Sequence, residues 1–235
     1  NYIYSIIFFR FYKNYFIIIG CNYNGKLSGC INDAYSMYNT FSNIPNEEIY
    51  LLTDNKEKIN KKIIENKIQS IHKKENKNSN SLYQIILTFS GHGEPNGILK
   101  LSENDLKCKE LYEIINYGSN KKFELIVILD CCYSGGFTNL GKYGNIDKST
   151  IITACNSSQQ SAESITVNIT VKNTKIKYDR NEKGDYYIGI FTFNFTKIIN
   201  NLIEKEKEIN TDNIFKDKIW NNIDVICKQS YQIKG

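Results

Sequence analysis

The sequence predicts an α/β fold in which a mostly parallel β-sheet is covered by helices on both faces. Two observations support this prediction. Short runs of branched apolar residues, typical of buried strands, alternate along the chain with segments whose apolar residues recur at helical spacing. Alternation of this kind favours parallel pairing, because each helix returns the chain to the start of the next strand. With 235 residues, 41% of them hydrophobic, residues 1–235 can bury one sizeable core, and a single domain is expected.

Five apolar segments are predicted to be core strands, and five periodic segments are predicted to be helices. The strands are residues 15–20, 48–52, 82–89, 123–129 and 149–154, and the helices are residues 33–41, 56–72, 106–115, 189–203 and 214–227. Thr53 or Asp54 is expected to cap the second helix, and His72 to lie on its polar side. Residues 138–148 have little apolar content and predict a loop, and the alternation in residues 165–178 predicts a hairpin.

The fourth predicted strand leads directly into a candidate nucleophile. Residues 125–129 are five consecutive branched apolar residues, and residues 130–136 read Asp-Cys-Cys-Tyr-Ser-Gly-Gly. Side chains just beyond the carboxyl ends of parallel strands line the crevice of an open α/β sheet. A thiol on such a turn is partly exposed, as a nucleophile must be.

A candidate base follows another predicted strand. The chain has two histidines, and His92 comes directly after the strand that contains the apolar run 85–87. If the two strands are parallel neighbours, His92 and Cys132 emerge at the same edge of the sheet, within reach of each other or of a bound substrate. His72 belongs to a lysine-rich helical segment and is expected to be a bystander.

The same residues carry a family resemblance. Ser-Gly-His-Gly at 90–93 and Asp-Cys-Cys-Tyr-Ser-Gly at 130–135 resemble motifs of the caspase-like cysteine peptidases, most closely the metacaspases. Segments 17–23, 27–34, 51–54, 154–163 and 189–192 are similar to further landmarks of that family, in the same order. The resemblance implies a caspase-like three-layer sandwich around a six-stranded sheet, and hydrolysis of peptide bonds.

For the reaction, the resemblance identifies Cys132, two residues after the aspartate, as the nucleophile. Adjacent residues of an extended chain face opposite sides, so Cys131 is expected to pack inward. His92 would orient the thiol and protonate the leaving amine. The backbone N–H groups of Gly93 and Cys132 are candidates for stabilising the oxyanion, since glycine allows close approach of the main chain. No third catalytic residue is identified.

Specificity is expected to follow from charge. The resemblance places Cys30, Asp33, Ser90 and Asp130 around the pocket for the residue that precedes the scissile bond. Two carboxylates there would bind guanidinium or ammonium groups, so the expected substrates are proteins or peptides with Arg or Lys at that position. The residues also allow structural alternatives: Asp33 as a helix N-cap, and Asp130 as an acceptor from the turn at residues 134–135.

Two departures from the metacaspase pattern bear on activity. Tyr133 replaces a histidine that is common after the catalytic cysteine, so a caspase-like module that has lost activity and serves as a scaffold stays an alternative, as does a peptidase of other specificity. Few acidic residues follow His92, and Asn139 stands where calcium-dependent members have an aspartate. Calcium prefers six to eight oxygen ligands. No metal or other cofactor is therefore expected to be required, and calcium activation should be weak or absent.

Composition sets the cellular expectations. The net charge of +5 comes from lysines mixed with glutamates and asparagines, which indicates a solvated surface and no nucleic-acid partner. Seven scattered cysteines without a C-x-x-C pair favour a reducing, cytoplasmic setting over disulfides or zinc. The apolar start is too short to span a bilayer, so no membrane association is expected, and residues 1–13 are interpreted as a truncated leader or an edge segment. A monomer is expected.

Self-cleavage is a further hypothesis from the sequence. The predicted loop that contains Lys142 and Lys148, and the basic region of residues 172–183 with Arg180, offer exposed basic residues beside the expected cleft.

Overall fold

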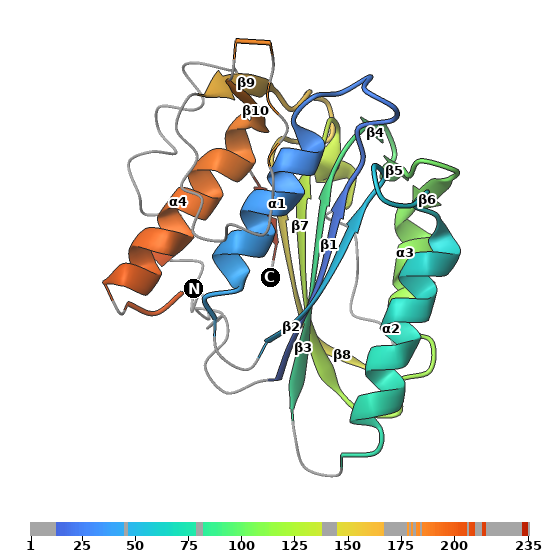
Figure 1. Cartoon of the computed structure of the whole chain (residues 1–235). Helices are drawn as coiled ribbons and strands as arrows, with labels where there is room; N and C mark the ends of the chain where they lie inside the picture. The colour runs from blue at the N-terminus through green and yellow to red at the C-terminus, as the bar shows by residue number, and fades with distance from the viewer. Residues whose placement is uncertain are drawn as a thin grey trace.

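A computed structural model describes the central part of the chain as one α/β sandwich (Figure 1). The described residues are 13–44, 47–78, 82–137, 145–166, 178, 180, 182–183, 185–205, 207–209, 213–214 and 232–234. Six strands form the central sheet in the order β11-β8-β7-β3-β1-β2. Neighbours from β8 to β2 are parallel, and only β11 runs antiparallel, to β8. The predicted mostly parallel, six-stranded α/β architecture is confirmed.

In the described part of the chain, the sheet strands and helices α1 to α4 follow the apolar segments of the sequence. The sheet strands are β1 (Lys13–Gly20), β2 (Glu47–Thr53), β3 (Tyr83–Ser90), β7 (Phe123–Asp130), β8 (Ile146–Thr153) and β11 (Gln232–Lys234). The helices are α1 (Cys30–Phe41), α2 (Lys61–Glu75), α3 (Cys108–Asn116) and α4 (Ile190–Glu204), and a short 3-10 turn, η1, covers Ser134–Phe137.

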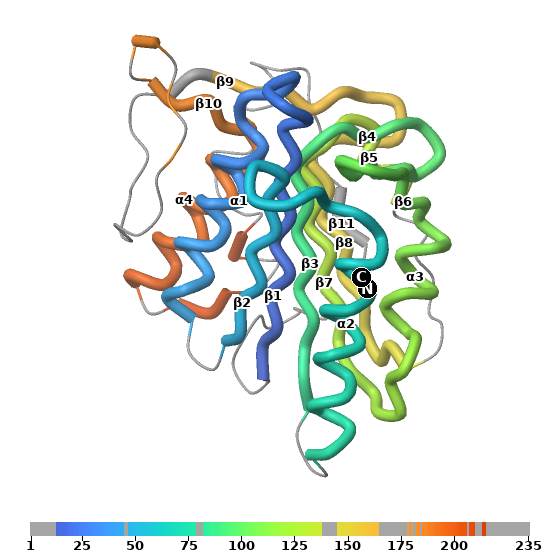
Figure 2. The backbone as a smooth tube through the Cα atoms, turned by 45° about the vertical axis from the view of Figure 1, so that its right-hand side comes forward, coloured from blue at the N-terminus to red at the C-terminus, as the bar shows by residue number. Residues whose placement is uncertain are grey.

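Two apolar cores lie on the two faces of the sheet. Successive side chains of β1, β3 and β7 alternate between them, so Ile17 packs on one side and Ile18 on the other. Helices α2 and α3 cover the first core, and α1 and α4 cover the second (Figures 1 and 2). Because both faces are buried, the strands are apolar throughout, which is why they are recognisable in the sequence.

Two smaller sheets extend the carboxyl end of the central sheet. Strands β4 (Gly93–Glu94), β5 (Ile98–Lys100) and β6 (Asp105–Lys107) form an antiparallel sheet that was not predicted. Strands β9 (Glu163–Thr166) and β10 (Tyr186–Gly189) pair antiparallel. Figure 2 shows both at the end of the sandwich where β3 and β7 finish.

Several predicted boundaries are wrong. The second helix starts at Lys61, and its cap is Asn60, whose side chain accepts from the Ile63 N–H at 3.1 Å. Neither Thr53 nor Asp54 has that role. His72 does not lie on a polar side but is fully buried.

The later segments differ from prediction in detail. The third helix starts at Cys108, because residues 105–107 form β6, and residues 146–148, expected in a loop, already belong to β8. Strand β9 pairs with β10. Residues 138–144, 167–177 and 215–227, which include most of the predicted loop, hairpin and last helix, lie outside the described residues. Within the described part of the chain, no helix is long and apolar enough to cross a lipid bilayer.

Candidate active site

The candidate residues lie together at the carboxyl edge of the central sheet, as expected. Strands β3 and β7 are parallel neighbours, and their last residues, Ser90 and Asp130, are paired. His92 therefore follows the end of β3 and Cys132 the end of β7, side by side. A pocket of about 120 Å³ opens at this edge. Its lining includes His92, Cys132, Asp33, Asp130, Ser161 and Glu163.

Cys132 sits on a tight turn after the strand. Its side chain is partly buried, and its Sγ lies 3.9 Å from the carbonyl oxygen of Ser161. The next residue, Tyr133, has φ of +55°, a left-handed conformation that is uncommon for a bulky side chain. The Tyr133 N–H donates to the Gln159 carbonyl oxygen at 2.8 Å, which fixes this turn against the segment after β8. The strained turn holds the Cys132 thiol at the pocket wall.

Cys131 packs inward, as predicted. It is 2% exposed, and burial raises the pKa of its thiol well above the ordinary value. A buried, protonated thiol is inert. Both cysteines line the pocket, but Cys131 is buried, whereas Cys132 is partly exposed.

The main chains of residues 93 and 132 approach closely. A Cβ atom added at Gly93 would lie only 2.0 Å from the carbonyl oxygen of Cys132, so no other residue fits here without a shift of the backbone. Gly93 pairs with Leu99 of β5, and the adjacent Lys100 N–H donates to the His92 carbonyl oxygen at 3.0 Å. Hydrogen-bonded pairs alternate in an antiparallel ladder, which directs the Gly93 N–H away from β5.

The pocket floor holds two buried carboxylates. The two Asp33 oxygens accept from the Ser90 hydroxyl at 2.5 Å and from the Gly189 N–H at 2.7 Å. Asp130 accepts from the Ser161 hydroxyl at 2.6 Å, and from the N–H and hydroxyl of Thr192 at 3.1 and 2.7 Å. Gly189 is the N-cap of α4 and Thr192 lies in its first turn, where the helix dipole favours negative charge.

Both carboxylates crowd around one glycine. A Cβ atom at Gly189 would lie 2.2 Å from Oδ2 of Asp130 and 3.0 Å from Oδ2 of Asp33. Burial raises the pKa of Asp33 well above its usual range, and the negative charge of Asp130 raises it further. Burial also raises the pKa of Asp130, against the lowering effect of the Ser161 and Thr192 hydrogen bonds. The pocket floor is thus an acidic site that lacks a cationic partner among the described residues.

Both structural alternatives for these aspartates are wrong. Helix α1 begins earlier than predicted, with Gly29 as its N-cap, and Asp33 is a buried residue of the first turn. Asp130 accepts from none of the groups of the turn at residues 134–135; the Ser134 hydroxyl donates instead to the Cys155 carbonyl oxygen at 3.3 Å.

Cys30 and Ser90 complete the predicted pocket. Ser90 is buried against Asp33, and the Cys30 Sγ lies 3.6 Å from Oε1 of Glu163. Burial raises the pKa of the Cys30 thiol, so this thiol lines the pocket as an uncharged group. All seven predicted site positions thus lie at the same edge of the sheet.

Sequence reasoning missed the roles of three further residues. Glu163 of β9 brings a third, exposed carboxylate to the pocket, and its Oε1 accepts from the Gly29 N–H at 3.1 Å. Ser161 and Thr192 hold Asp130. Segments 154–163 and 189–192 stood out as landmarks, but no sequence signal showed that they meet Asp130. In the described ranges, no group of three or more His, Cys, Asp and Glu side chains could hold a metal ion.

Comparisons with known proteins agree with the architecture. The family model described as the caspase domain, Peptidase C14, matches residues 13–211. A crystal structure of protein GSU0716 from Geobacter sulfurreducens is similar with a TM-score of 0.61 and 16% sequence identity, over 94% of this chain and 92% of the other. At that identity the similarity concerns the fold alone. No curated protein sequence matches this chain.

Proposed function

Because the chain belongs to the caspase-domain family of cysteine peptidases, we propose that it is an endopeptidase of the metacaspase type that cleaves after Arg or Lys. The observation that carries the proposal is the pocket in which a thiol, an imidazole and three carboxylates face the same space. A thiol with an imidazole suits acyl transfer. Buried carboxylates beside them suit a cationic substrate side chain.

In the proposed reaction, the Cys132 thiolate attacks the carbonyl carbon of the scissile bond. The C–N bond breaks, the His92 imidazolium gives its proton to the leaving amine, and an acyl-thioester remains on Cys132. Water, deprotonated by His92, then attacks the thioester, which releases the carboxylic acid and the thiolate. The N–H groups of Gly93 and Cys132 would stabilise the oxyanion in both steps.

The proposed specificity follows from the charge at the pocket floor. A guanidinium or ammonium group would approach Asp33 and Asp130, whose carboxyl groups are close together and buried. Its positive charge would relieve their mutual repulsion, whereas an acidic side chain would add to that repulsion. The Glu163 carboxylate at the pocket wall would favour the same substrates.

Paired fluorogenic peptides test this proposal. Wild type should hydrolyse peptides that end in Arg or Lys and leave the matching Asp peptide intact. Cys132→Ala should lower kcat by a factor of about 1,000 or more. The matched control is Cys131→Ala, which removes the neighbouring buried thiol and should retain activity. Absence of hydrolysis by wild type would favour the scaffold alternative, and faster cleavage of the Asp peptide would contradict the specificity.

Calcium activation is proposed to be weak or absent. The acidic residues that follow His92 are engaged elsewhere: Glu94 and Asp105 both form ion pairs with Lys100. Asn139 lies outside the described residues. Calorimetric titration with calcium, alongside rate measurements, is expected to show neither micromolar binding nor a matching rise in rate.

Self-cleavage is also part of the proposal, with fewer candidate positions. Lys148 lies within β8, where its backbone pairs with Glu124 of β7, so it is a poor site. Lys142 and most of residues 172–183 lie outside the described residues, and Arg180 is exposed. Incubated wild type should yield fragments that end at one of these basic residues, whereas Cys132→Ala should stay intact.

A further inference from the structure

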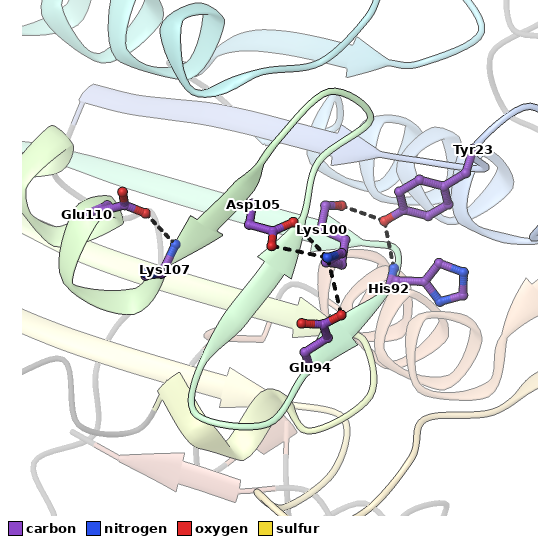
Figure 3. A network of polar contacts seen from close by, with 7 residues as sticks. All are labelled: Tyr23, His92, Glu94, Lys100, Asp105, Lys107 and Glu110. Carbon is purple, nitrogen blue, oxygen red and sulfur yellow. Dashed lines mark hydrogen bonds and ion pairs between the residues drawn. The ribbon is translucent and has the colours of Figure 1, made fainter.

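Tyr23, on the loop between β1 and α1, contacts the proposed catalytic histidine in two ways (Figure 3). Its ring stacks on the His92 imidazole, with centroids 4.8 Å apart and planes 26° apart. Its hydroxyl accepts from the His92 N–H at 2.7 Å and donates to the Lys100 carbonyl oxygen at 2.6 Å. The sequence placed Tyr23 in a landmark segment but gave it no role.

The Tyr23 hydroxyl takes the place of a backbone hydrogen bond. The Lys100 N–H donates to the His92 carbonyl oxygen at 3.0 Å. Opposite residues of such an antiparallel pair normally exchange both backbone bonds, so the His92 N–H would reach the Lys100 carbonyl. Here the phenolic oxygen bridges these two groups instead. The Tyr23 oxygen therefore separates the His92 N–H from the Lys100 carbonyl oxygen next to the pair formed by β4 and β5.

The bridge is anchored on both sides. The Asp54 carboxylate accepts from the N–H groups of Tyr23 and Asn22 at 2.7 and 2.9 Å, which fixes a left-handed Tyr23 with φ of +53°. A Cβ atom at Gly91 would lie 2.5 Å from the Tyr23 oxygen. A larger residue at position 91 would therefore displace the Tyr23 hydroxyl.

On the hairpin side, Lys100 is held by two carboxylates. Its Nζ lies 3.2 Å from Oε1 of Glu94 and 2.9 Å from Oδ1 of Asp105 (Figure 3). These ion pairs connect β5 to both of its neighbouring strands. The Lys100 carbonyl oxygen, which accepts from the Tyr23 hydroxyl, thus belongs to a three-stranded sheet that these ion pairs also hold together.

We propose that Tyr23 is the positioning residue of the reaction, which sets the main chain and the ring plane of His92 relative to Cys132. This inference rests on the proposed function. Tyr23 is not among the described residues that line the pocket, so it should not bind the substrate. Both hydrogen bonds of its hydroxyl are in use, and burial raises the pKa of this group far above its ordinary value. It therefore does not transfer protons and acts through His92 alone.

Two substitutions separate the hydroxyl from the ring. Tyr23→Phe keeps the stack and removes the bridge, and should lower kcat about 10-fold, since a small misplacement of a catalytic group is costly. Tyr23→Leu removes both and should lower kcat about 100-fold. KM should stay within about two-fold in both, because substrate contacts are untouched. The control is Tyr50→Phe on β2, which removes a hydroxyl that donates to Glu48 and should leave kcat unchanged.

The NMR spectrum of the two histidine rings gives a readout that needs no activity. The His92 ring protons should be shifted upfield by the Tyr23 ring in wild type and in Tyr23→Phe, and this shift should vanish in Tyr23→Leu. The buried His72 ring is an internal reference, and its unchanged signals would show that each variant is folded. Unchanged His92 signals in Tyr23→Leu, or unchanged kcat in both variants, would overturn the inference. If wild type has no peptidase activity, the proposed function fails, and the NMR result alone decides whether Tyr23 orients His92.

Discussion

Buried polar side chains occupy both ends of the central sheet, but their partners differ. Near the amino end, the fully buried His72 lies 2.9 Å from the Tyr83 hydroxyl and 2.8 Å from the Ile115 carbonyl oxygen. Burial lowers the pKa of His72, so the ring is neutral and each nitrogen has a neutral partner. At the carboxyl end, Asp33 and Asp130 accept only from uncharged donors, so no cation offsets the cost of ionising them.

The difference indicates which end supports the fold and which end supports activity. A satisfied neutral network stabilises a core, whereas neighbouring buried carboxylates cost stability until a cation binds. Groups that lower stability in this way are typically found at functional sites. The following substitutions test this comparison, and the smallest expected effect comes last.

Asp33→Asn should lower kcat/KM for Arg peptides about 100-fold, because it removes a buried charge that would pair with the substrate. The amide can keep both hydrogen bonds, accepting from the Gly189 N–H and donating to the Ser90 oxygen. Initial rates measured over a range of peptide concentrations give the change. The control is Glu75→Gln, a buried carboxylate near the amino end that accepts from the Tyr15 hydroxyl at 2.5 Å. An equal loss of activity in both variants would contradict the assignment.

The two histidines should show opposite effects. His72→Ala should lower the free energy of unfolding by about 3 kcal/mol, because it leaves a cavity and removes the hydrogen bonds to the Tyr83 hydroxyl and the Ile115 carbonyl oxygen. It should leave kcat/KM nearly unchanged. His92→Ala should abolish activity but change stability by less than about 0.5 kcal/mol, since the side chain is exposed. Urea denaturation and peptide hydrolysis measure the two effects. An equal loss of stability in both variants would contradict the assignment of different roles to the two histidines.

The stability of the carboxyl end should depend on pH. The raised pKa of Asp33 means that the folded state holds this proton more tightly than the unfolded state does. Its contribution to stability is therefore present below the ordinary aspartate pKa of about 4 and is lost as the pH rises through the raised value. Asp33→Asn should then exceed wild type in stability at pH 8, by about 1 kcal/mol, and much less at pH 5. Urea titrations that show no growth of this difference with pH would argue against a strained pair.

Glu163→Gln should have the smallest effect. Its carboxylate is exposed, so solvent screens its charge, and KM for Arg peptides should rise only a few-fold. A loss of kcat/KM as large as that of Asp33→Asn would indicate that Glu163 of β9, and not the pair of aspartates, is the main group that recognises the substrate charge.

The sequence predicted the apolar layer and the paired ends of β3 and β7 because strands buried on both faces, such as residues 123–129, are continuous apolar runs. The small sheet β4-β5-β6 was missed because strands of two or three residues show no periodicity. The start of α2 was misplaced because Ile59, which is fully buried, belongs to the apolar pattern but precedes the cap.

The missed parts of the site depend on contacts between distant segments. Ser161 reaches Asp130 across 31 positions, and Tyr23 reaches Lys100 across 77. Tyr23 and Thr192 both lie in segments that resemble family landmarks, but nothing in the local sequence shows which groups they contact. Only the folded arrangement of β9 and α4 around the pocket reveals which polar groups the aspartates meet.

The ratio of kcat/KM for two peptides that differ only in arginine or citrulline before the scissile bond tests the central claim most directly. Citrulline keeps the shape of arginine but carries no charge. Because a bound guanidinium would favour the ionised forms of Asp33 and Asp130, wild type should prefer arginine by about 100-fold or more, and Asp33→Asn should lose most of that preference. Equal cleavage of the two peptides by wild type would contradict the account.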